Sequence, residues 1–164
     1  MKNLHPSSIW LFFFQGVRAV LFLLIPPFYF LFIFSVRGVD IEIPVIFPIL
    51  FIVWFIILLV IAYIWAKLSY QNYKYELTDN GFKKELGVIR KKYVTIPYDR
   101  IQNVDIDRGI IARILGLSDI KIQTAGMSGM MGAEGRLPGL SVQDAEIVRD
   151  DLIKRAKTHT NQGV

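Results

Sequence analysis

The chain has 164 residues, of which 53% are hydrophobic, and it carries a formal net charge of +5 and no cysteine. This apolar fraction exceeds that of most soluble domains, and the lack of cysteine excludes disulfides and thiolate metal sites. The positive charge is compatible with an anionic membrane surface as much as with nucleic acid.

Two long uncharged stretches lie in the first part of the chain. Residues 19–36 and 43–66 contain no charged side chain, and roughly 20 apolar residues in a helix cross a hydrocarbon core of about 30 Å. We expect two transmembrane helices here. A cleaved signal peptide is disfavoured, because no small-residue cleavage site follows the first stretch. The apolar segment Ile9–Arg18 either extends the first helix or lies at the membrane interface.

The short linker Arg37–Glu42 makes the two spans a hairpin, with both chain ends on one side of the membrane. Basic residues flank the spans on that side, and the linker has one arginine against two acidic residues. The positive-inside rule then places both termini in the cytoplasm. We divide the chain into 1–68 with the two spans, a domain over 69–158, and a disordered tail over 159–164.

After the second span the hydrophobic pattern changes to the alternation of β-strands. The expected strands are 73–79, 82–87, 89–96, 101–108 and 118–124, with a helical turn at Ile110–Leu115. Asn80-Gly81 between the first two strands predicts a type I′ hairpin turn, because both residues accept a positive φ.

The C-terminal part predicts a loop and then a helix. Residues 125–139 are rich in Gly and Met and indicate a loop, with a short strand around Gly135–Leu137 as an alternative. An amphipathic helix over 141–159 follows, with Ser141 as its N-cap and Asp144 three residues later. Antiparallel strands and one closing helix predict an α+β domain, a curved sheet or partial barrel capped by that helix.

One stretch of the domain resembles a known family. Residues 94–126 are similar to the signature of membrane-anchored bacterial pleckstrin-homology-like proteins (YdbS type), a family of unknown function. The matching positions are Pro97, Arg100–Gln102, Val104, Arg113–Gly116 and Thr124–Gly126. The upstream hairpin, the closing helix and the spans resemble that architecture too, so the resemblance covers nearly the whole chain. It implies a pleckstrin-homology-like fold at the inner face of a prokaryotic plasma membrane, with no known enzymatic activity.

Asp105 and Asp107 form an Asp-x-Asp pair that could ligate a divalent metal. They alternate with Val104 and Ile106, however, as on the wet face of a half-buried strand. The chain's two histidines, at positions 5 and 159, lie far away in sequence, so further ligands are missing. We expect surface ion pairs with Arg108 or Lys121, and no catalytic residue, metal site or cofactor.

The densest basic cluster is the candidate binding site. Strand order directs the turn at Gly87–Ile89 toward the bilayer. One interpretation is charge that orients the domain; the other is a specific site for an anionic lipid or an acidic peptide. The candidate residues are Lys83, Lys84, Arg90, Lys91 and Lys92.

These features favour a membrane-anchored binding or scaffold module. Its expected partners are the lipid bilayer, an anionic phospholipid, and a membrane protein or a second copy of the chain, and not nucleic acid. The Met-rich loop either is mobile or adapts to a partner. The alternative function is an accessory subunit of a membrane enzyme or transporter, with the hairpin making the contacts. An enzyme using Asp105 and Asp107 is disfavoured.

Overall fold

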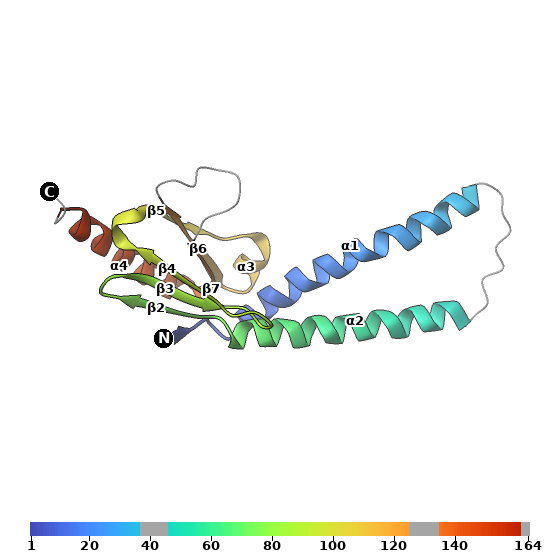
Figure 1. The fold of residues 1–164 in the computed structure, drawn as a ribbon. Helices are drawn as coiled ribbons and strands as arrows, with labels where there is room; N and C mark the ends of the chain where they lie inside the picture. Colours follow the sequence, from blue (N-terminus) through green and yellow to red (C-terminus); the bar gives the residue numbers. More distant parts are fainter. Residues whose placement is uncertain (37–45, 125–134, 162–164) are drawn as a thin grey trace.

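The computed structural model describes residues 1–36, 46–124 and 135–161. It joins a pair of long helices to a small domain of two β-sheets and a closing helix, and the helices extend from one end of that domain (Figure 1). The elements are β1 Lys2–Asn3, α1 Ser8–Val36, α2 Ile46–Gln71, β2 Lys74–Thr78, β3 Gly81–Leu86, β4 Lys92–Pro97, η1 Tyr98–Arg100, β5 Ile101–Asp107, α3 Ile110–Ile114, β6 Leu117–Thr124, β7 Gly135–Ser141 and α4 Val142–Asn161.

The two long helices differ from the predicted spans at their ends. α1 begins at Ser8, so the segment Ile9–Arg18 extends the helix. α2 continues to Gln71, beyond the uncharged run, and leads almost directly into β2. Within the described residues, one helical stretch is long and apolar enough to cross a membrane, Phe51–Gln71, while the apolar stretch Ser8–Phe22 is shorter. The two-span hairpin therefore stays a prediction, and the linker lies outside the described residues.

The first sheet has the strand order β1-β2-β3-β4, with antiparallel pairs. The predicted hairpin is present, but its loop is Asp79-Asn80, because Thr78 pairs with Gly81. No described residue other than glycine has a positive φ, so the type I′ turn at Asn80-Gly81 was wrong. Gly81 is instead required by close packing, since a Cβ there would lie 2.5 Å from the carbonyl oxygen of Ile96.

The second sheet has the order β5-β6-β7. β7 occupies all of the described part of the predicted loop, residues 135–139, so the loop prediction was too long. The rest of that loop, residues 125–134 with the Met-rich segment, lies outside the described residues. Pro138 made this strand hard to recognise in the sequence, because proline is uncommon within strands. It is tolerated because β7 is at the edge of its sheet, where proline costs no ladder hydrogen bond, and the pairing with β6 shifts register between Ser118 and Ile120.

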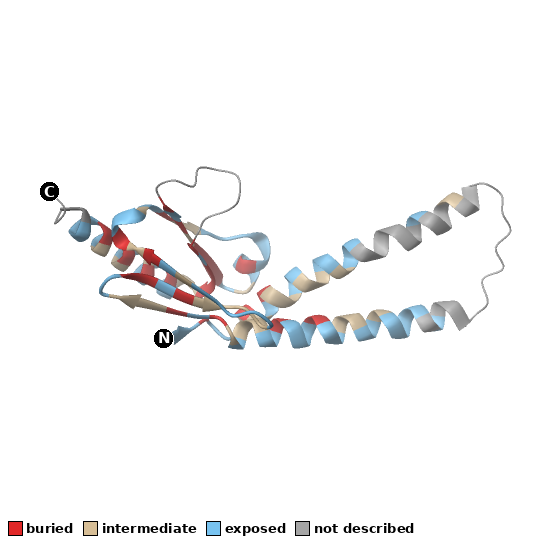
Figure 2. Cartoon of the chain, in the orientation of Figure 1, coloured by how far each residue is buried: buried red, intermediate tan, exposed pale blue. Residues whose placement is uncertain are grey.

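The core lies between the sheets and under α4, as the buried residues show in Figure 2. α4 contributes Ala145, Val148 and Leu152, which are spaced along one face as predicted. Its N-cap is also as predicted, since the Asp144 amide donates to Ser141 Oγ at 3.0 Å. The fully buried side chains of the core include Phe82, Ile96, Tyr98, Ile120, Ile122, Leu137, Leu140 and Leu152.

The predicted tail is partly helical. α4 runs to Asn161, and the ring of His159 stacks on Tyr98 with centroids 5.5 Å apart. Arg155 lies 5.8 Å from the centroid of the same tyrosine ring. These contacts hold the end of the helix on η1, which corrects the assignment of 159–161 to a disordered tail. Residues 162–164 lie outside the described part of the chain.

The start of the chain belongs to the domain, contrary to the boundary predicted at residue 68. β1 pairs with β2, and Leu4 is buried in the domain core. At the start of α1, Ser8 Oγ lies 2.6 Å from the carbonyl oxygen of Gly139, and the His5 amide donates to the same oxygen at 3.2 Å. The first helix is thereby fixed to β7.

Candidate functional site

The two aspartates lie on the outer face of β5. Asp105 accepts hydrogen bonds from Asn103 Nδ2 at 2.9 Å and from Gln123 Nε2 at 2.8 Å. Asp107 forms the predicted ion pair with Lys121, at 2.5 Å, and this hydrogen bond and charge lower the pKa of Asp107. Both carboxylates thus have protein partners. The described residues hold no group of three or more metal-ligating side chains of the His, Cys, Asp and Glu types.

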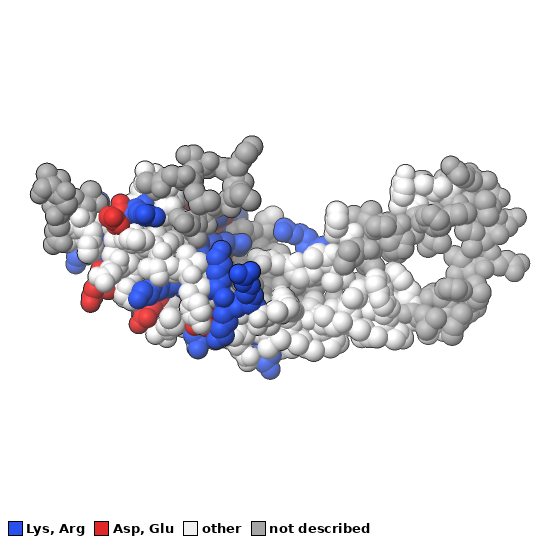
Figure 3. All heavy atoms as spheres, in the orientation of Figure 1, with Lys and Arg blue, Asp and Glu red and all other residues white. Residues whose placement is uncertain are grey.

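The basic turn, residues Gly87–Lys92, lies at the end of the first sheet that adjoins α2. Strand register establishes this position: β2 starts at Lys74, immediately after α2, and Lys74 pairs with Glu85 near the end of β3. β4 then starts at Lys92, opposite Leu86. On the face shown in Figure 3, basic atoms gather at this junction, and acidic atoms lie toward the far end of the domain.

Glycine 87 shapes the turn. Its φ of +112° lies in a region that L side chains rarely adopt, and a Cβ would overlap the carbonyl oxygen of Arg90. The turn is wider than expected, so β4 begins at Lys92 and not at Ile89. Arg90, Lys91 and Lys92 are all exposed.

Lys91 has an ion-pair partner, and among the described residues its neighbours Arg90 and Lys92 have none. Its Nζ donates to Glu85 Oε1 at 2.8 Å. This hydrogen bond raises the pKa of Lys91 and lowers the pKa of Glu85. Because Glu85 offsets the charge of Lys91, Arg90 and Lys92 supply most of the net positive charge of the turn.

The structure separates the other two candidate residues. Lys83 and Lys84 are consecutive in β3 and therefore point to opposite faces of the sheet. Lys83 is exposed, whereas Lys84 is 8% exposed and its Nζ donates to the carbonyl oxygen of Arg136 at 3.2 Å. The hydroxyl of Tyr73 donates to the same oxygen. Lys84 thus joins the two sheets, and we leave it out of the exposed basic surface.

Sequence reasoning missed an apolar residue at the tip of this turn. Ile89 is 87% exposed, and Tyr93 at the start of β4 is 67% exposed. An isoleucine between a turn glycine and three basic residues was the available signal. A basic turn with an exposed apolar tip suits the boundary between phospholipid headgroups and acyl chains, where basic side chains meet phosphates and apolar ones are buried.

The comparisons with known proteins agree with the sequence resemblance. Residues 19–156 match the family described as Bacterial PH domain. The chain is also 29% identical over 160 residues to UPF0699 transmembrane protein YdbT of Bacillus subtilis (strain 168). That match covers 94% of this chain but 29% of the relative, so the chain spans under a third of its length. No solved structure matches the chain significantly.

Proposed function

The chain belongs to the bacterial PH domain family, and from that premise we propose that it is a non-catalytic membrane-anchored binding or scaffold module. In this proposal α1 and α2 form a transmembrane hairpin in a prokaryotic plasma membrane. The hairpin holds the pleckstrin-homology-like domain against the cytoplasmic face, with both termini on that side. The basic turn contacts anionic phospholipid headgroups.

The charge distribution supports the orientation. Lys67 and Lys74 are exposed at the domain end of α2, and the basic turn adjoins them. The other end of the helix pair carries the linker, with one arginine against two acidic residues. Basic residues close to the ends of spans are retained in the cytoplasm, which favours a cytoplasmic domain.

The position of the basic turn supports the proposed ligand, an anionic phospholipid. Its backbone is fixed by strand pairing at the end of the sheet nearest α2, so the bilayer surface lies within reach whenever α2 spans the membrane. Each basic side chain near an anionic surface contributes about 1 kcal/mol. Arg90 and Lys92 would therefore contribute about 2 kcal/mol, enough to orient a domain that is already anchored.

The test uses the full chain in lipid nanodiscs. Hydrogen exchange of residues 87–92 is compared between discs of phosphatidylglycerol and discs of phosphatidylcholine. We expect slower exchange in the anionic lipid, and loss of that difference in the double variant Arg90→Glu/Lys92→Glu. The matched control, Lys154→Glu/Lys157→Glu, makes the same charge change at exposed positions on α4, near the far end of the domain. Equal exchange in both lipids would contradict the lipid assignment.

A protein ligand is the competing outcome. Crosslinking of the native membrane protein, scored for protein and lipid together, separates the two. If Arg90→Glu/Lys92→Glu removes a crosslinked protein and leaves the lipid dependence of exchange unchanged, then the turn is a protein-binding site. The domain would in that case be a binding module for a protein partner, whereas the accessory-subunit alternative predicts that the crosslinked protein is held by the helix hairpin and survives the double substitution.

A further inference from the structure

The short helix α3 exposes an unusual amount of apolar surface. Ile110 and Ile114 are each 79% exposed, and Ile111 is 40% exposed, although the helix has only five residues. Its one buried residue, Ala112, packs inward. Ile110 and Ile114 are four residues apart and therefore share one helix face. Neither isoleucine belongs to the core clusters formed by the described residues.

The register of the two long helices shows where α3 lies along their axes. It lies at the level where α2 changes from apolar to charged. A Cβ on Gly16 would lie 3.5 Å from Ala62, which puts these residues at one level of the antiparallel pair. Five residues toward the domain, about 7.5 Å along each axis, lie Leu11 on α1 and Lys67 on α2. Lys67 is the first charged residue after the uncharged run of α2. Leu11 belongs to one buried cluster with Ala112 of α3 and Leu117.

The aromatic residues near the level of Leu11 and Lys67 are of the types found at a membrane surface. Trp10 is exposed, and its ring lies 6.4 Å from that of Tyr63 on α2. Tryptophan and tyrosine are enriched at the level of the phospholipid headgroups. α3 therefore lies beside the start of α1, at the level where the uncharged run of α2 ends (Figure 1).

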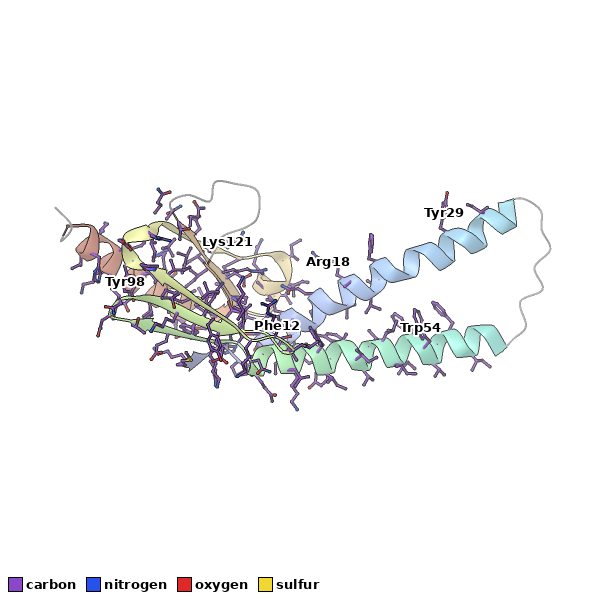
Figure 4. The ribbon with its side chains drawn as sticks, in the orientation of Figure 1. Phe12, Arg18, Tyr29, Trp54, Tyr98 and Lys121 are labelled. Atoms are coloured by element: carbon purple, nitrogen blue, oxygen red, sulfur yellow. The ribbon has the colours of Figure 1, made fainter. Side chains whose placement is uncertain are left out.

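Basic residues flank the exposed isoleucines in the sequence. Residues 108–117 contain Arg108 and Arg113 and no acidic residue. Arg18 is seven residues after Leu11, on the same face of α1 and about 10 Å further along the axis; it is exposed and lies on the side of α1 away from α2 (Figure 4). A long arginine side chain at that depth extends back to the headgroups. The surroundings of α3 thus suit anionic lipid.

We propose that α3 is an interfacial helix of this protein, with Ile110 and Ile114 in the outer acyl region of the bilayer and Arg113 among the headgroups. The occupant of this apolar face is the lipid of the membrane that the hairpin crosses, so the inference rests on the proposed anchoring. The basic turn adjoins α2 and α3 adjoins α1. The domain then meets the lipid on both sides of the helix pair.

The chain's lack of cysteine allows a direct test. The single-cysteine variants Ile114→Cys, Ile147→Cys and Ile57→Cys of the full chain are labelled with a nitroxide and reconstituted in vesicles containing phosphatidylglycerol. Collision with oxygen, which concentrates in lipid, is compared with collision with a water-soluble nickel chelate. Ile147 is the matched control, since it is 67% exposed on α4. Ile57 lies within the apolar stretch of α2 and reports the anchoring itself.

We expect the oxygen-to-nickel collision ratio at 114 to exceed that at 147 several-fold, and the ratio at 57 to be higher still. A water-like ratio at 114 with a lipid-like ratio at 57 would overturn the inference and leave the anchoring intact. A label at 114 that is immobile and shielded from both reagents would overturn it in favour of a protein partner. A water-like ratio at 57 would refute the anchoring.

Discussion

Replacing Gly139 by alanine should detach the start of α1 from the domain. Gly139 has a φ of +67°, and an added Cβ would overlap Ser8 Oγ. The left-handed backbone costs an L residue about 1–2 kcal/mol. The overlap also displaces the two hydrogen bonds from Ser8 and His5 to the Gly139 carbonyl oxygen, each of which contributes about 0.5–1.5 kcal/mol.

A second glycine separates the two causes. Gly116 has the same φ of +67°, but a Cβ there would meet no atom within 4 Å. Gly116→Ala therefore carries the backbone cost alone, about 1–2 kcal/mol. Gly139→Ala adds the lost hydrogen bonds, about 1–3 kcal/mol in total. That difference corresponds to a roughly 5- to 150-fold increase in local opening.

The assay is hydrogen exchange of the full chain, which reports local opening directly. The amide of His5 should exchange faster in Gly139→Ala by that factor, and its rate in Gly116→Ala should stay close to that of the unaltered chain. Equal rates in the two variants would refute the reasoning, because the contact between Ser8 and Gly139 would then contribute nothing to holding α1. Faster exchange confined to α3 in both variants would also refute the reasoning.

Three further predictions concern the core, the end of α4 and the topology. Leu152→Ala should lower the free energy of unfolding by about 2–5 kcal/mol, because Leu152 is fully buried, whereas Ile147→Ala, at an exposed position, should change it by less than about 0.5 kcal/mol; chemical denaturation measures both. His159→Ala should cost about 0.5–1.5 kcal/mol through loss of its stacking on Tyr98, and an unchanged midpoint would show that the stacking is not stabilising. Lys157→Cys should react with a membrane-impermeant maleimide only after cells are permeabilised, and labelling of intact cells would refute the cytoplasmic orientation.

Local sequence patterns predicted most elements because each depends on neighbouring residues. Period-two alternation located β2, β5 and β6, the turn residues Asn80-Gly81 located the hairpin that returns as β3, and Ser141 with Asp144 located the start of α4. β7 was recognised only in part. Pro138 and Gly139 usually interrupt strands, and the edge position that tolerates them depends on strand order, which no local pattern contains.

The candidate surface was predicted in part for the same reason. The run of basic residues is visible in the sequence, and strand order placed the turn beside the spans. The inward direction of Lys84 depends on the second sheet, whose Arg136 carbonyl it contacts. The exposure of Ile110 and Ile114 depends on which side of α3 packs against α1. The direction of Lys84 and the exposure of the two isoleucines follow from tertiary packing. Whether a single residue is polar or apolar does not determine either of them.

The two chain connections and their contacts determine how freely the domain moves on the helices. α2 leads into β2 after only two residues, and α1 is fixed to β7 through Ser8 and Gly139. Since β2 and β7 belong to different sheets, rotation of the domain about either helix would break contacts at the other. On the proposed topology the far end of the domain, with α4, always faces the cytoplasm. A soluble partner bound there would be held at a fixed height above the membrane, which is what a scaffold requires.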